Sequence, residues 1–68
     1  MLEKRSVSLS GHRTSIALEP EFWAALRKLA ENDGKTLASL VAQVDAGRNP
    51  AQPLASALRV FVLKKAMG

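Results

Sequence analysis

Apolar and polar side chains alternate between residues 13 and 18, a spacing that is typical of a β-strand with one buried face. One face carries the side chains that can lie on a helical core: Thr14, Ile16 and Leu18. The opposite face carries a guanidinium, a hydroxyl and a methyl group: Arg13, Ser15 and Ala17. The pattern therefore predicts a short strand whose second face is open to its surroundings.

Residues 4–9 alternate more loosely, with valine and leucine on one side and two serines on the other. Ser10 and Gly11 then interrupt the pattern. Three interpretations stay open for this segment: a flexible basic arm, a short extra strand, or an early part of the main strand. We take residues 1–11 as a basic N-terminal arm, and we expect no internal repeat in the chain.

Helical signals follow the strand. Pro20 suits the first turn of a helix, where its missing N–H costs nothing, and Gly34 suits the left-handed cap that ends it. Thr36 is a good N-cap for a second helix, which the segment 47–53 breaks. Residues 53–66 predict a third helix, although their valines also permit a strand.

Apolar residues recur at spacings of three and four in each helix and so predict one buried stripe per helix. In the first helix these residues are Phe22, Ala25, Leu26 and Leu29, with Trp23 beside the stripe. In the second helix they are Leu37, Leu40, Val41 and Val44. In the third helix they are Leu54, Leu58, Phe61 and Val62.

A lone strand leaves one row of backbone N–H and C=O groups unpaired, and a second copy is its simplest partner. A chain of 68 residues without cysteine also has few other ways to complete a core. We therefore expect a mostly α fold with one short strand, assembled as a homodimer. The residues expected in the dimer core are Thr14, Ile16, Leu18, Phe22, Leu26, Leu29, Leu37, Leu40, Val41 and Val44.

The net charge of +4 doubles in a dimer and would attract a polyanion. Lys4, Arg5, His12 and Arg13 concentrate this charge near the N-terminus. No stretch has the length of a membrane span or of a secretory signal, so we expect a cytoplasmic protein without a membrane partner.

Catalysis finds no support in the sequence. The single histidine has no acidic partner at a readable spacing, and the chain has neither a cysteine nucleophile nor a glycine-rich phosphate loop. One histidine without cysteine cannot build a zinc site either. We therefore expect no enzyme activity, no cofactor and no metal.

Four segments follow one another along the chain: the strand RTSIAL, the helix start EPEF, the helix end ENDG and the start of the second helix, KTLASLV. In this order the chain resembles the ribbon-helix-helix (Arc/MetJ-type) DNA-binding proteins over roughly residues 12 to 45, and as a whole it resembles small bacterial members of that family. The resemblance implies an intertwined homodimer that inserts an antiparallel ribbon into the DNA major groove. It also implies tandem dimers on an operator. The chain would then be one domain with an arm (1–11), a strand-helix-helix core (12–46) and an additional third helix (53–66).

The resemblance assigns DNA contacts residue by residue. The outward strand positions Arg13, Ser15 and Ala17 would contact bases, and arginine can bond guanine O6 and N7 together. Ala17 departs from the polar residue common at this position and offers only a methyl contact, so the basic arm or DNA deformability would supply further selectivity. The resemblance places phosphate contacts at the start of the second helix, at Thr36, Leu37 and Ala38 with Lys35 beside them, and the charge of the basic arm adds Lys4 and Arg5.

The predicted function is sequence-specific or semi-specific binding of double-stranded DNA by a homodimeric transcriptional regulator. The alternative is an antitoxin-like or scaffold module, in which the same dimer binds a protein partner through the apolar face of the third helix.

Overall fold

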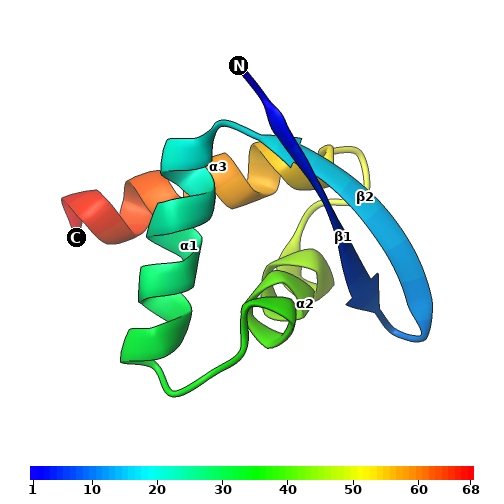
Figure 1. Ribbon diagram of the computed structural model, residues 1–68, viewed down its shortest axis with the longest axis horizontal. Coiled ribbons are helices and arrows are strands. Elements are labelled where there is room, and N and C mark those ends of the chain that lie inside the picture. Colours follow the sequence, from blue (N-terminus) through cyan, green and yellow to red (C-terminus); the bar gives the residue numbers. More distant parts are fainter.

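The computed structural model describes residues 1–68, which form two strands followed by three helices (Figure 1). In chain order the elements are β1 (Glu3–Leu9), β2 (His12–Leu18), α1 (Pro20–Asn32), α2 (Leu37–Gly47) and α3 (Leu54–Met67). The fold is mostly helical, as the sequence predicts, but it has two strands where the sequence predicts one.

β1 and β2 form an antiparallel hairpin within one chain. Ser10 and Gly11 form the turn between them, with φ angles of 49° and 83°. A two-residue turn with positive φ at both positions has the twist that joins antiparallel strands. Because this local turn closes the hairpin, the segment predicted as an arm supplies an extra strand, Glu3–Leu9, and β2 pairs along one edge with a strand of its own chain.

The hairpin has seven residue pairs, from Glu3 opposite Leu18 to Leu9 opposite His12. Directly opposite residues of antiparallel strands point to the same face of the sheet. The inner face supplies four buried side chains: Val7, Leu9, Ile16 and Leu18. Both strands therefore contribute equally to the core.

α1 ends in a turn that requires a left-handed residue. Gly34 has a φ of 66°. Its amide donates to the Glu31 carbonyl at 3.0 Å, and the Lys35 amide donates to the Ala30 carbonyl at 2.8 Å. This pair of bonds is the Schellman motif, and it confirms the predicted glycine stop.

The buried face of α1 is centred one residue away from the predicted stripe. Trp23, Leu26 and Ala30 are buried, whereas Phe22 and Leu29 pack at the edge of the core. The hairpin lies against the Trp23 side of α1 and accepts its indole N–H, and this contact moves the stripe.

The connection between α2 and α3 confirms the predicted break after the second helix. Arg48 follows the last residue of α2, and its guanidinium donates to the Asp45 carboxylate and to the Gln52 carbonyl, each at 2.8 Å. α3 then begins at Leu54, directly after Pro53. One arginine thus holds both ends of this connection.

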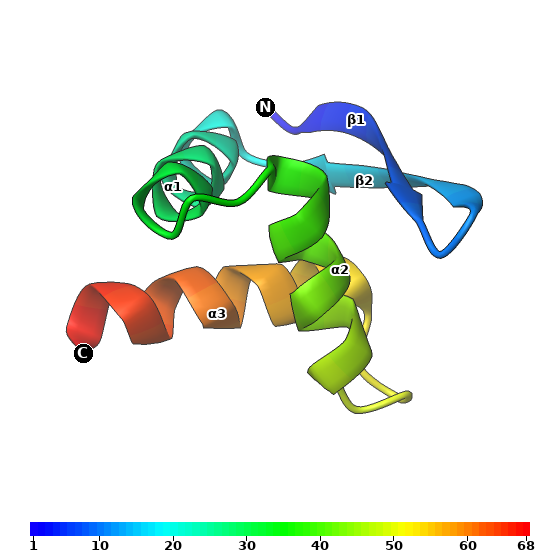
Figure 2. The ribbon, with the colours of Figure 1, turned by 90° about the horizontal axis from the view of Figure 1, so that it is seen from below.

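Figure 2 shows that α2 begins beside the hairpin and crosses α3, and α3 also contacts α1 and β2. Ten buried residues from all five elements form the core: Val7, Leu9, Ile16, Leu18, Trp23, Leu26, Ala30, Leu40, Val41 and Leu58. Of the ten residues expected in a dimer core, five lie in this buried core of a single chain: Ile16, Leu18, Leu26, Leu40 and Val41. Phe22, Leu29, Leu37 and Val44 pack partly buried against it, and Thr14 is half-buried on β2.

The turn generates the first prediction. Ser10→Asn should raise the free energy of unfolding by up to about 1 kcal/mol, because asparagine adopts positive φ more readily than serine. Gly11→Ala should lower it by about 1–2 kcal/mol through conformation alone, since a Cβ there would meet no atom within 4 Å. Urea denaturation measures both changes. A Ser10→Asn variant less stable than the parent would contradict this turn.

Candidate nucleic-acid interface

The outward face of the hairpin presents six side chains in three opposed pairs. These pairs are Lys4 with Ala17, Ser6 with Ser15, and Ser8 with Arg13. Ala17 is half-buried and the other five are exposed. We call these six residues the ribbon face. It is narrow, polar and free of bulky apolar groups, and a two-stranded ribbon has the width to enter a DNA major groove.

The two cations of the ribbon face have no acidic partner. The ion pairs of the chain join Arg5 to Glu3, Arg48 to Asp45 and Arg59 to Glu19. Lys4 and Arg13 take part in none of them. Their charges are therefore available to an anion that approaches the ribbon face.

Arg5 lies on the other face of the hairpin, away from Lys4. Its guanidinium lies over the Trp23 ring, 5.3 Å from the ring centroid, and pairs with the Glu3 carboxylate. Although the sequence groups Arg5 with Lys4 as a phosphate contact, the alternation of the strand sends the two side chains in opposite directions.

The start of α2 carries the remaining predicted phosphate contacts. The Ser39 amide donates to Thr36 Oγ1 at 3.0 Å, so the threonine hydroxyl serves as the cap that the sequence predicts. The amides of Leu37 and Ala38 have no acceptor within the chain. The Lys35 ammonium donates to the Gln43 side chain and so lies along α2. Figure 2 shows this first turn of α2 on the same side of the molecule as the hairpin.

The end of the hairpin is joined to α3 by an ion pair. Glu19 directly follows β2, and its carboxylate accepts a bond from the Arg59 guanidinium at 2.9 Å. This bond, with a smaller contribution from a backbone N–H, lowers the pKa of Glu19 below its ordinary value. The pair therefore contributes to stability above the ordinary pKa of glutamate, and the contribution is lost as the pH falls through the lowered pKa.

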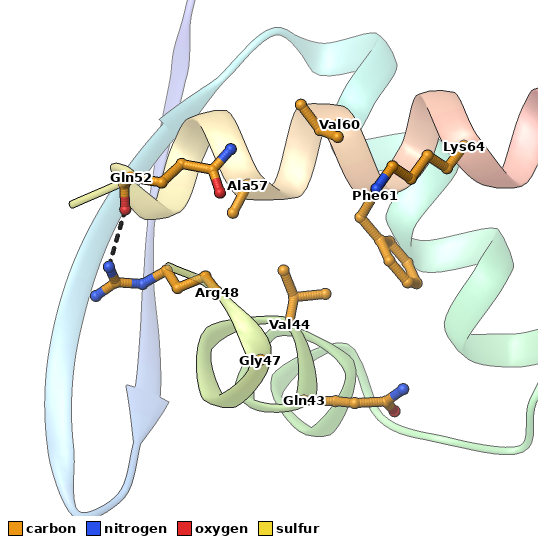
Figure 3. A pocket seen from close by; sticks show the side chains of 9 residues that line it. All are labelled: Gln43, Val44, Gly47, Arg48, Gln52, Ala57, Val60, Phe61 and Lys64. Atoms are coloured by element: carbon orange, nitrogen blue, oxygen red, sulfur yellow. Dashed lines mark hydrogen bonds between the residues drawn. The ribbon is translucent and has the colours of Figure 1, made fainter. Parts of the chain in front are cut away.

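A groove of about 310 Å³ lies between α2 and α3, away from the ribbon face (Figure 3). Its apolar lining comes from Val44, Ala57, Val60 and Phe61. Gln43, Gly47, Arg48, Gln52 and Lys64 complete it. The groove contains no carboxylate, and no group of three or more metal-ligating side chains occurs in the chain.

Three residues of this region were not predicted as contacts from the sequence. Ser6 and Ser8 lie on the ribbon face, and Trp23 supports β1 from below it. The two serines had a visible signal, because they alternate with Val7 and Leu9 in the sequence. Trp23 had none, since its partner is a backbone carbonyl twenty residues earlier.

The comparisons with known proteins agree with this geometry. A family model for the ribbon-helix-helix domain matches residues 2–66, and the chain belongs to that family. It is also similar to the solved structure of an uncharacterized protein from Bordetella pertussis Tohama I, with 29% sequence identity and a TM-score of 0.81. The match covers 98% of this chain and 57% of that chain, so this chain spans little more than half the length of that protein. No curated protein matches the chain. None of its helices is long and apolar enough to cross a membrane.

The support of the ribbon face can be tested at Trp23. Its indole Nε1 donates to the Glu3 carbonyl at 2.8 Å, and Trp23→Phe removes this bond, whose loss costs about 1 kcal/mol. In this variant, amide hydrogen exchange followed by NMR should accelerate more in the first residues of β1 than in the turn. Phe61→Leu, a reduction of a half-buried ring on α3, serves as the control. Equal acceleration throughout the hairpin in Trp23→Phe would contradict a local role.

Proposed function

We propose that this protein binds double-stranded DNA as a homodimer and acts as a transcriptional regulator, with the ribbon face in the major groove. Ribbon-helix-helix proteins are generally DNA-binding transcriptional regulators or antitoxins, and their domains bind DNA as dimers. The observation that carries the proposal is the ribbon face itself. It presents two unpaired cations and small polar groups on a strand pair whose other face is buried.

Base contacts fall to the outward residues of both strands. Arg13 can form two bonds with guanine O6 and N7, Ser15 can bond several base edges, and Ala17 can contact a thymine methyl group. Lys4 lies opposite Ala17 and so adds a cation to a base-facing row. We therefore propose Lys4 as a contact on the ribbon face, alongside the three residues of β2.

Phosphate contacts fall to the first turn of α2. The amides of Leu37 and Ala38 are available as donors, and the positive end of the helix dipole lies there. Thr36 shapes this turn through its cap, and the Lys35 ammonium, which donates to Gln43, adds a charge along the same helix. Arg5 faces away from the ribbon face and supports β1 instead.

The homodimer would place two ribbon faces on one operator. Two faces double the number of phosphate and base contacts, which raises affinity and makes its salt dependence steeper. Tandem dimers would extend the same arrangement along a longer operator. Since each chain already pairs its own strands, the contact between copies lies outside the β1–β2 pairing.

Arg13→Ala tests the proposed base contact. It should weaken binding to a preferred duplex by about 5- to 100-fold, because a good bidentate contact with guanine discriminates by that amount. Arg27→Ala, on the exposed side of α1, removes the same charge and should change affinity far less. Fluorescence anisotropy with labelled duplexes at two salt concentrations measures both variants. An Arg13→Ala, Lys4→Ala double variant that bound duplex at low salt as tightly as the parent would exclude the ribbon face.

Sedimentation velocity tests the homodimer. At micromolar concentration the protein should sediment as a species of twice the chain mass of 7.3 kDa. The same experiment with an operator duplex should show two chains or a multiple of two on the DNA. A species of one chain, alone and on the duplex, would refute the dimer while leaving DNA binding intact.

A protein-interaction module is the second candidate, and the groove between α2 and α3 favours it. Its apolar lining beside Lys64, which takes part in no ion pair, suits an apolar segment of a partner protein that carries an acidic residue, as in an antitoxin or scaffold role. Val60 and Leu63 leave further apolar surface exposed on α3. A protein that co-purifies at fixed stoichiometry, together with no DNA binding at low salt, would favour this function over the first.

A further inference from the structure

The two strands of the hairpin repeat the same pattern of residues. Residues 4–9 read Lys-Arg-Ser-Val-Ser-Leu, and residues 13–18 read Arg-Thr-Ser-Ile-Ala-Leu. The serine and the final leucine are identical, and a cation, a β-branched residue and a small residue each replace their own kind, whereas Arg5 aligns with the unlike Thr14. Because the repeat is short and its matches are mostly conservative replacements, the sequence alone predicts no repeat, and it is the strand register that reveals one.

The register turns this repeat into an approximate two-fold symmetry. Ser6 lies opposite Ser15 at the middle of the hairpin. A two-fold axis through that pair, perpendicular to the sheet, exchanges the strands and places Lys4 on the position of Arg13. It also places Ser8 on the position of Ala17, so the outward pattern of cation, serine and small residue is the same in both directions.

The four buried side chains of the inner face obey the same symmetry, whereas the half-buried Arg5 and Thr14 of that face are unlike. The axis exchanges Val7 with Ile16, and Leu9 with Leu18, and all four side chains are buried. A ribbon of this kind normally needs two identical strands to be symmetric about such an axis. Here the two strands belong to one chain and are joined by the turn at Ser10 and Gly11.

The spacing of the two cations can be compared with DNA. Lys4 and Arg13 belong to opposed pairs that are four residues apart along the hairpin. At about 3.4 Å per residue, this separation is about 14 Å. Base pairs follow one another at about 3.4 Å, so the two cations stand about four base-pair steps apart.

We propose that the hairpin of a single chain recognises a near-palindromic DNA element of about five base pairs, with a guanine on each strand at opposite ends. The proposal rests on the proposed DNA binding and adds to it the recognised pattern and the residues that set it. Arg13 contacts the guanine of one strand, and Lys4 contacts the guanine of the other. The Ser6 and Ser15 hydroxyls face the central base pairs, where they discriminate little.

The two halves of the ribbon face differ in their cation, which is Lys4 on β1 and Arg13 on β2. Arginine bonds guanine through a rigid planar fork, whereas lysine presents a compact charge on a flexible stem. The guanine facing Arg13 is therefore selected more strongly than the guanine facing Lys4. A dimer would place two such elements on one operator, each recognised by the hairpin of one chain.

Selection of bound duplexes from a random pool tests the proposal on the full chain. The parent should select two guanines on opposite strands about four steps apart, one more strongly than the other. Lys4→Arg should equalise the two preferences and give a symmetric element. Lys4→Ala and Arg13→Ala should each abolish the preference at one end only, by about 5- to 100-fold. Arg27→Ala, on α1, should leave the selected element unchanged.

Two different results would overturn the proposal, and they separate an error in the two-fold recognition from an error in the proposed DNA binding. If the parent selects a motif that Lys4→Ala and Lys4→Arg leave unchanged, DNA binding stands but the two-fold recognition by one hairpin is wrong. If the parent binds no duplex at low salt, the proposed function itself fails. Circular dichroism of each variant confirms that it is folded before selection.

Discussion

Trp23 is buried in the first helix, and its indole nitrogen donates to the backbone carbonyl of Glu3 at the beginning of β1. The Arg5 guanidinium covers the same ring, so one side chain holds the first strand from two directions. Val7 and Leu9 anchor the second half of β1 in the core, so without the Trp23 contact the first residues of β1 would depend mainly on their pairing with β2, and a two-stranded hairpin is marginal in water. The outward position of Lys4, between Glu3 and Arg5, depends on this support.

The turn at Ser10 and Gly11 has a consequence for recognition. By closing the ribbon within one chain, it allows the two strands to differ, whereas a ribbon made by two copies must carry identical strands. The outward residues of the two strands nevertheless remain similar, with a lysine in one strand where the other has an arginine. The inner faces must both fill the same core, and this requirement keeps Val7 similar to Ile16. The outer faces differ mainly in the strength of their cations.

Local signals allowed much of the fold to be predicted from the sequence. Pro20, Gly34 and Thr36 act within one turn of their own positions, and each has the role that its chemistry predicts. The partner of β2 was beyond such reasoning, because serine is an uncommon residue at the first position of a positive-φ turn. The Trp23 contact depends on a backbone carbonyl, which carries no side-chain signature.

The candidate site was predictable in part for the same reason. Arg13, Ser15 and Ala17 follow from the alternation of one strand, and the structure places them on one face. Joining them to Lys4, Ser6 and Ser8 required the register between two strands, which the composition of neither strand determines. Arg5 was grouped with Lys4 by charge, but period-two alternation places it against the aromatic core.

We propose that the outward face of the hairpin meets DNA. An NMR titration of the isotopically labelled protein with a selected duplex tests this claim directly, because each backbone amide reports on its own surroundings. We expect the largest shifts at the start of α2, on the amides of Leu37 and Ala38, and on the ribbon face, on the amides of Lys4, Ser6, Ser8, Arg13, Ser15 and Ala17. Shifts confined to the groove between α2 and α3, with the hairpin unchanged, would contradict it.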